Sequence, residues 1–175
     1  RKRQWILQHA ILMNDHDVRR YADYGLHVTT CKGFHWGKGD YYAERIGKHT
    51  WKDLIPLRRL LDHGITVGCG TDWGPRNVFE QIQLAETCEF AQSGYRNLDA
   101  GQAITREEAL LMWTRDAARV LGWSGVGTLA KGNHADITIV DRNPLECEIE
   151  ALPKTKILKT IFSGEDVFDS GDLDN

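Results

Sequence analysis

At 175 residues, the chain has room for one ordinary domain, or for one large piece with a small annex. Apolar residues make up 41% of it and charged residues 27%, which is typical of a globular protein with a core. The formal net charge of −3 gives no electrostatic case for binding nucleic acid or an anionic membrane, and no apolar run approaches the ~20 residues that cross a bilayer.

The four cysteines are far apart and form no C-x-x-C motif, so their spacing supports neither a zinc knuckle nor a redox dithiol. Cys31 and Cys69 fall in expected strands, which suits buried free thiols in a reducing compartment. We therefore expect a cytoplasmic location, with disulfides as the alternative. The chain begins at Arg1 without a methionine, which indicates a start internal to a longer protein.

The first two thirds of the chain alternate between strand-like and helix-like runs. Apolar stretches predict strands, and N-cap residues, periodicity and terminal glycines predict helices. The expected strands are 5–10, 26–31 and 65–70, and the expected helices are 14–25, 51–64 and 77–92. Pro56 is either tolerated near the start of the second helix or kinks it. This β-α-β-α-β-α order with near-continuous apolar strands is typical of a parallel sheet flanked by helices.

Residues 105–122 form the clearest expected helix, because Thr105 and Glu108 make a capping box ahead of an apolar face. Beyond Gly122, glycine-rich turns alternate with β-like runs at 135–141 and 156–168, which indicates a small β unit. Three parallel strands leave at least one sheet edge open. We therefore expect more barrel or sheet to be supplied upstream.

Polar residues follow each expected strand at its C-terminal end, where function collects in parallel α/β folds. These residues are His9 after the first strand, Lys32, His35 and Trp36 after the second, and Asp72 and Trp73 after the third. An imidazole and a carboxylate at one rim suit a divalent metal, and the carboxylate can move a proton to and from an activated water. The alternative is structural, since a lone strand histidine is more often structural and Asp72 can cap a helix or close an Asx-turn.

Residues 33–50 are interpreted as a loop that is long for a βα connection, and such loops tend to be functional or mobile. Their aromatic and basic side chains either wall a substrate pocket or pack the loop onto the body. The residues concerned are Phe34, Trp36, Tyr41, Tyr42, Lys38 and Arg45, together with the preceding Lys32.

Several segments, in the right order, resemble the amidohydrolase superfamily, and in particular the branch called amidohydrolase family three, which includes N-substituted formamide deformylases. LQHA (7–10) resembles the sixth barrel strand, and GCGTDWGP (68–75) resembles the segment after the eighth strand. Residues 127–145 resemble the start of the C-terminal part of the family's small β-sandwich domain, and the 105–122 helix resembles a family helix. The likeness covers nearly the whole chain.

The resemblance implies an α/β fold in which residues 1–122 form about strands six to eight of a metal-dependent hydrolase TIM (β/α)8 barrel with its final helices. Residues 123–175 are then the C-terminal segment of a composite β-sandwich. It also implies that His9 and Asp72 are metal ligands and that Asp72 is the catalytic proton shuttle. One or two divalent ions are expected, with zinc the favoured metal and the other ligands outside this chain. Gly74, which displaces the family's proline to Pro75, bears on local turn shape.

Two hypotheses from different classes follow. In the first, the chain is the C-terminal portion of an enzyme that hydrolyses a carbon–nitrogen bond of an amide or cyclic amide, and it is inactive on its own. Small-molecule substrate is expected to contact Trp73, Arg76, Lys32, His35 and Trp36. In the second, the chain is a catalytically incomplete homologue or a half-barrel scaffold. Either way, the expected partner is the remainder of the barrel, from an upstream segment or another chain, with a homo-oligomer as a further option and neither nucleic acid nor membrane.

Overall fold

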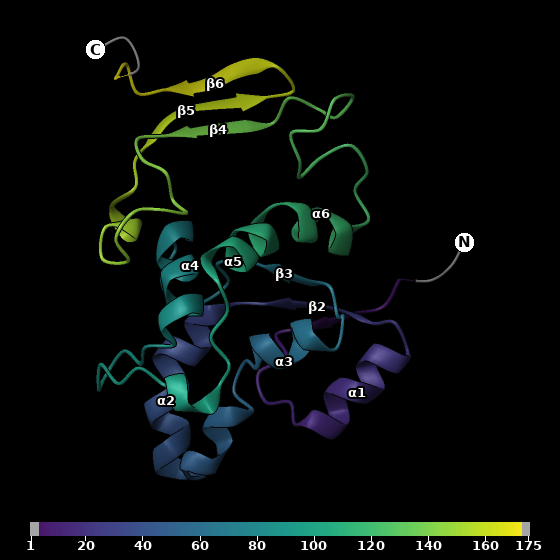
Figure 1. The fold of residues 1–175 in the computed structure, drawn as a ribbon, viewed down its shortest axis with the longest axis vertical. Coiled ribbons are helices and arrows are strands. Elements are labelled where there is room, and N and C mark those ends of the chain that lie inside the picture. The colour runs from purple at the N-terminus through teal and green to yellow at the C-terminus, as the bar shows by residue number, and fades with distance from the viewer. Residues whose placement is uncertain (1–3, 173–175) are drawn as a thin grey trace.

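The structure is a computed structural model that describes residues 4–172, so Arg1, with which the chain starts, lies outside the described residues. The fold is α/β and contains a parallel sheet and an antiparallel sheet, each of three strands (Figure 1). The strands of the parallel sheet are β1 (Ile6–Gln8), β2 (His27–Thr30) and β3 (Val67–Cys69). Those of the antiparallel sheet are β4 (Ile137–Val140), β5 (Ile157–Phe162) and β6 (Glu165–Asp169).

The helices connect and cover these strands. They are α1 (Asp15–Asp23), α2 (Lys32–Arg45), α3 (Leu57–Asp62), α4 (Val78–Thr87), α5 (Arg106–Trp113) and α6 (Arg115–Leu121), with short 3-10 helices η1 (Lys48–Lys52), η2 (Leu98–Ala100) and η3 (Leu152–Lys154). Two predicted helix starts are confirmed. The side chain of Asn14 accepts a hydrogen bond from the backbone N–H of Asp17, and Thr105 and Glu108 form both bonds of a capping box.

The parallel sheet has the order β1-β2-β3, with Leu7 opposite Val28 and Val28 opposite Val67. Because the strands are parallel, their C-terminal ends meet at one rim. Helices α5 and α6 lie on one side of this sheet, and α1 and α3 lie on the other (Figure 1). Gly68 explains the close contact with α6, because a Cβ at this position would lie 3.2 Å from Cα of Ala117.

The buried core lies between this sheet and its helices. Two strand valines, Val28 and Val67, are fully buried and belong to one apolar cluster that includes the α3 residues Leu57 and Leu60. Phe90, which follows α4, belongs to the same cluster and is also fully buried. The core therefore fixes the strands against the helices that follow them, and this in turn fixes the residues at the strand ends.

The prediction of a loop over residues 33–50 is wrong, because most of this segment is α2, followed by η1. Glycines lower helix propensity by about 1 kcal/mol each, and they obscure the helical pattern in the sequence. In the structure, the absence of a side chain at these glycines lets aromatic rings pack directly against α2. A Cβ at Gly37 would lie 2.2 Å from the ring of Trp73, and a Cβ at Gly39 would lie 2.2 Å from the ring of Phe90.

Other predicted helices are present but shorter than expected. Helix α3 begins only at Leu57, with Pro56 at its N-cap position, and α4 ends before Cys88, which is left-handed with φ +50°. The 105–122 helix is interrupted at Thr114, where ψ is −97° and the side-chain hydroxyl donates to the carbonyl of Leu110 at 2.9 Å. Such a bond from a Thr side chain to the preceding turn bends helices.

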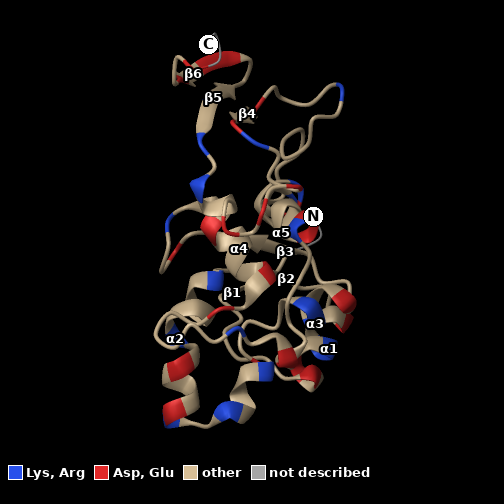
Figure 2. Ribbon diagram, turned by 60° about the vertical axis from the view of Figure 1, so that its left-hand side comes forward, with Lys and Arg blue, Asp and Glu red and all other residues tan. Residues whose placement is uncertain are grey.

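The predicted β unit after Gly122 is confirmed as the antiparallel sheet β4-β5-β6, which lies at the far end of the molecule from α1 and α2 (Figure 1). Lysines and arginines are interspersed with acidic residues over both parts of the chain, and they form no single-sign face in this view (Figure 2). Within residues 4–172, no helix has the length and apolarity needed to cross a membrane.

Candidate metal and active site

The structure brings His9 and Asp72 together at the C-terminal rim of the parallel sheet. His9 directly follows β1, Asp72 lies three residues beyond β3, and Nδ1 of His9 is 3.4 Å from Oδ2 of Asp72. Both side chains are partly solvent-exposed, at 38% and 52%. With Cys69, Gly70 and the ends of β1 and β2 they line a pocket of about 170 Å³.

The backbone holds His9 in an unusual conformation. His9 has φ +71° and Ala10 has φ +48°, so two consecutive non-glycine residues adopt the left-handed region. The backbone N–H of His9 donates to the carbonyl of Thr29 at 2.7 Å, and the Thr30 hydroxyl donates to the carbonyl of His9 at 2.6 Å. Such residues cost of order 1–3 kcal/mol each and cluster at functional sites. The turn aims the imidazole along the rim toward Asp72.

The loop that carries Asp72 rests on the first turn of α2. A Cβ at Gly33 would lie 1.9 Å from the carbonyl oxygen of Trp73, so only glycine allows this approach. The buried thiol of Cys31 donates to the same oxygen at 2.9 Å. Gln81 of α4, which is 1% exposed, accepts from the Gly33 N–H at 3.0 Å and donates to the Pro75 carbonyl at 2.7 Å. The loop that carries Asp72 is therefore held in place by contacts of Trp73 and Pro75, the residues that follow it.

An aromatic row extends from the histidine to the loop. The ring of Phe34 meets His9 edge-on at a centroid distance of 5.1 Å and stacks parallel to Trp73 at 5.8 Å. The ammonium of Lys38 lies 5.3 Å from the centroid of the Trp73 ring, which is within the range of a cation–π contact. Trp73 is 41% exposed, so its outer edge is open to a ligand at this rim.

The five residues expected to contact substrate fall into two groups. Trp73 is in the aromatic row, and Arg76 is exposed on the same loop. Trp36 is partly exposed, and its carbonyl accepts from the Ala91 N–H at 2.8 Å. Lys32 and His35 are 2% and 0% exposed, and the structure does not bring them to the His9–Asp72 pocket.

Burial governs the titration of two groups near this rim. Burial, and secondarily the nearby Lys32, holds the pKa of His35 well below its ordinary value, so this imidazole is uncharged at neutral pH. Cys69 keeps some exposure as a residue, yet burial raises the pKa of its thiol to about 12. At neutral pH the Cys69 sulfur is therefore a protonated thiol.

The donor set fits a divalent ion in part. Tetrahedral zinc with ligand bonds of 2.0–2.1 Å has donor atoms roughly 3.3–3.4 Å apart, which agrees with the 3.4 Å between Nδ1 of His9 and Oδ2 of Asp72. Within residues 4–172 there is no group of three or more histidine, cysteine, aspartate or glutamate side chains that holds a metal. Among the described residues, His9 and Asp72 therefore present two candidate donor atoms at one rim, fewer than the four of a tetrahedral zinc site.

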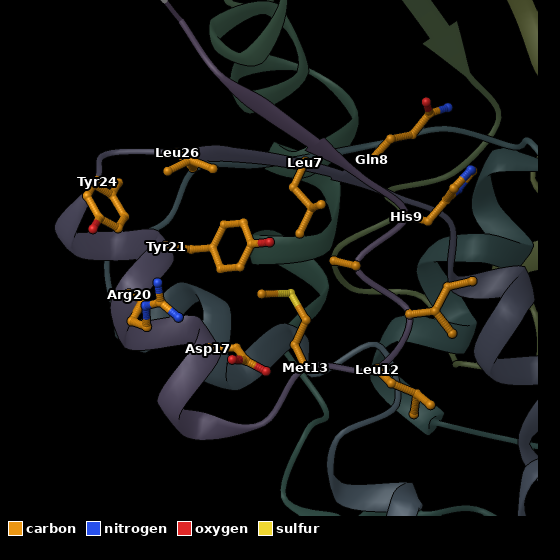
Figure 3. Close-up of a pocket in the computed structure, with 12 residues that line it drawn as sticks. Leu7, Gln8, His9, Leu12, Met13, Asp17, Arg20, Tyr21, Tyr24 and Leu26 are labelled. Atoms are coloured by element: carbon orange, nitrogen blue, oxygen red, sulfur yellow. The ribbon is translucent and has the colours of Figure 1, made fainter.

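A larger groove begins at the same histidine. It has a volume of about 720 Å³ and runs between β1 and α1, with His9 at one end and Tyr24 and Leu26 at the other (Figure 3). Its walls are mostly apolar, including Leu7, Met13 and Tyr21. Strand β1 is an edge of its sheet, so the groove lies beside an open strand edge.

The residues that position the site are not among those predicted from the sequence. Gln81 and Thr30 carry no motif, and Cys31 was interpreted only as a buried thiol. The one available signal was the spacing of Gly33 and Gly37, which places two glycines on one face of a helix. That signal is readable only once the segment is known to be helical.

Comparison with known proteins gives consistent relatives. A family model described as "Amidohydrolase family" matches residues 1–168. The chain is 28% identical over 166 residues to the N-substituted formamide deformylase of Arthrobacter pascens, with 90% of this chain and 30% of that protein covered. It is 28% identical over 164 residues to 5-methylthioadenosine/S-adenosylhomocysteine deaminase 1 of Syntrophus aciditrophicus (strain SB), covering 91% and 33%.

Among solved structures, the chain resembles the atrazine chlorohydrolase of Arthrobacter aurescens TC1 complexed with zinc. The TM-score is 0.65 at 26% sequence identity, and 94% of this chain and 36% of that chain are covered. The chain thus spans about a third of the length of the relatives that it matches.

Proposed function

Because the chain belongs to the amidohydrolase family, we propose that it is the C-terminal portion of a metal-dependent hydrolase that cleaves a carbon–nitrogen bond of an amide or cyclic amide. The observation that carries this proposal is the meeting of His9 and Asp72 at the strand rim, with donor atoms 3.4 Å apart. The names of the two relatives, a formamide deformylase and a deaminase, support chemistry at carbon–nitrogen bonds.

In this proposal, residues 1–122 form strands six to eight of a (β/α)8 barrel and its last helices, and residues 123–175 belong to a composite β-sandwich. The parallel strands follow the order β1-β2-β3, and helices connect each strand to the next, which supports their being consecutive strands of a barrel. The open edge of β1 and its apolar groove provide a surface for the preceding barrel strand. A second apolar groove of about 770 Å³, between α5, α6 and the antiparallel sheet, is suited to the rest of the sandwich.

His9 and Asp72 would hold a divalent ion, with zinc the expected metal, and the ion would supply Lewis acidity that lowers the pKa of a water molecule. Asp72 then works as a general base and acid: its carboxylate accepts a proton from the attacking water and delivers it to the departing nitrogen. The partial exposure of Asp72 lets substrate reach it, and the contacts of Cys31 and Gln81 hold the loop that carries it.

The remaining residues of the rim shape the substrate pocket. Trp73 provides an apolar wall, and Arg76 provides a cation on the same loop for a polar or acidic part of the substrate. The other metal ligands come from the rest of the barrel, which is either an upstream segment of the same protein or another chain. The isolated chain is therefore expected to bind metal weakly and to lack turnover.

The test uses the intact gene product, with metal content and hydrolysis of an N-substituted formamide and a cyclic amide as readouts. Asp72→Asn is expected to lower turnover at least about 100-fold, because it removes the proton-transfer group. The matched control is Asp15→Asn, since Asp15 forms a similar pair with His63 at 3.5 Å and a similar exposure of 50%, away from the rim.

Full turnover and unchanged metal content in Asp72→Asn would refute the assignment of Asp72. An intact protein that holds no metal and hydrolyses neither probe would instead support the scaffold hypothesis. Equal losses in the Asp72 and Asp15 variants would show a general effect on folding, and would remove the support for a specific role of the rim.

A further inference from the structure

A buried amine and a buried thiol lie in contact between α2 and the end of α4, and neither residue lines the rim pocket. The Nζ atom of Lys32 is 3.4 Å from the Sγ atom of Cys88, and the two residues are 2% and 0% exposed. Within the described part of the chain, this sulfur is the one hydrogen-bond partner of the Lys32 ammonium or amine. The pair joins the first turn of one helix to the end of another.

This environment is unusual for a lysine. Lysines are almost never fully buried unless they are paired with an acid, and a cysteine sulfur is only a weak acceptor. His35, one turn further along α2, is also fully buried, and neither of its ring nitrogens has a hydrogen-bond partner in residues 4–172. The contact between Lys32 and Cys88 therefore offsets little of the free energy that burying an amine costs.

We propose that Lys32 and Cys88 form an oxidative modification site, in which one oxygen atom bridges Nζ of Lys32 and Sγ of Cys88. The oxidant is dioxygen. The S–H bond of Cys88 and one N–H bond of the Lys32 amine break, and an S–O and an O–N bond form. The O–O bond breaks, and the second oxygen leaves as water with the two released hydrogens. The sulfur and the nitrogen each give up two electrons, which together reduce one dioxygen.

The geometry favours this reaction over other thiol oxidations. Cys88 is fixed in the left-handed conformation at the end of α4, where its N–H donates to the Leu84 carbonyl at 3.0 Å. Lys32 is fixed by the first turn of α2, so the two reacting atoms stay adjacent. Cys31, which precedes Lys32, has its thiol engaged with the Trp73 carbonyl. A sulfenic acid formed at Cys88 therefore has the lysine amine as its immediate neighbour.

The bridge would link two segments that support the candidate site. Residues 32 and 88 are 56 positions apart, so the crosslink closes a long loop in the unfolded chain. Such a constraint raises the thermal midpoint, provided that it introduces no strain in the native state. It also ties the start of α2, on which the Trp73 loop rests, to the end of α4.

The test is peptide mapping of the full chain after exposure to air-saturated buffer, or to hydrogen peroxide, of which two molecules replace one dioxygen. The expected product is a linked pair of peptides containing Lys32 and Cys88, with a mass increased by one oxygen and decreased by two hydrogens. Trypsin does not cut after the bridged Lys32, and treatment with a thiol reductant restores both peptides. The crosslinked form is also expected to have a higher thermal midpoint than the reduced form.

Cys88→Ser and Lys32→Met are each expected to abolish the linked peptide, whereas Cys147→Ser, which removes a partly exposed thiol outside the Lys32–Cys88 contact, leaves it unchanged. Because the link is read directly in the parent chain, the test stands even if Lys32→Met does not fold. The proposal is overturned if Cys88 is recovered as a free thiol, as an unlinked oxygen acid or in a disulfide. This result is independent of whether the chain contributes to a hydrolase.

Discussion

Replacing Gly33 by alanine tests how the loop that carries Asp72 is positioned. The new Cβ would lie 1.9 Å from the carbonyl oxygen of Trp73, and 3.2 Å from the Cys31 sulfur that donates to that oxygen. Because the nearest atom belongs to the backbone, no side-chain rotation relieves this contact. The loop must move away from α2 as a unit.

The magnitude follows from the contacts that this movement breaks. Overpacking costs about 1–3 kcal/mol. The loop also loses the hydrogen bonds from Cys31 to Trp73 and from Gln81 to Pro75, each about 1 kcal/mol. The gain in helix propensity from glycine to alanine returns about 1 kcal/mol. We therefore expect Gly33→Ala to lower the free energy of unfolding by about 2–4 kcal/mol.

The assay is urea unfolding of the full chain, with Gly70→Ala as the matched control. Gly70 lies two residues before Asp72, but a Cβ there meets no atom within 4 Å and its φ is not positive. Its replacement should leave stability unchanged or raise it by about 0.4–1 kcal/mol, because alanine restricts the unfolded chain. If Gly33→Ala were as stable as Gly70→Ala, the inferred support of the loop by α2 would be wrong.

Two further substitutions probe other contacts. Gln81→Leu leaves the Gly33 N–H and the Pro75 carbonyl without their partner, so it should lower the free energy of unfolding by at least about 2 kcal/mol. The control Gln83→Leu removes one bond, to the Ile149 carbonyl, and should lower it by only about 1 kcal/mol. A larger loss for Gln83→Leu than for Gln81→Leu would contradict this reasoning. Hydrogen bonds from the Arg142 side chain and the Lys156 N–H lower the pKa of Asp141 from 3.8 to about 2. Because the folded pKa is lower, the stability contributed by Asp141 is complete above the unfolded pKa and is lost as the pH falls through about 2. In acid titrations followed by circular dichroism, the parent should be more stable than Asp141→Asn above pH 3.8, and this difference in stability should disappear as the pH falls to about 2. A difference in stability that does not change with pH would refute the assignment.

The positions and order of the strands could be predicted from the sequence because each strand is a compact apolar run between turn residues. The pairing of His9 with Asp72 also followed, since parallel strands place their C-terminal ends at one rim whatever the details of packing. These features depend on local patterns and on one topological rule.

The residues that support the His9–Asp72 pair could not be predicted, because their roles depend on tertiary packing that produces no local pattern in the sequence. Gly33, Gly37 and Gly39 suggest a loop by propensity, but their missing side chains are what admits Trp73 and Phe90 against α2. Gln81 is far from Asp72 in sequence and acts through the backbone of other residues. Burial of Lys32 likewise reflects the tertiary contact of α2 with α4, which the sequence of either helix does not reveal.

The left-handed backbone at His9 and Ala10 has a consequence for which amino acids can replace them. Histidine, asparagine, aspartate and glycine tolerate φ near +71°, while valine, isoleucine and threonine do not. Replacement of His9 thus costs least for a short set of residues, most of which carry a donor atom for a metal or for hydrogen bonds. The hydrogen bonds of Thr29 and Thr30 hold this turn in shape, and the turn restricts which residues fit at position 9 independently of any role in binding or catalysis.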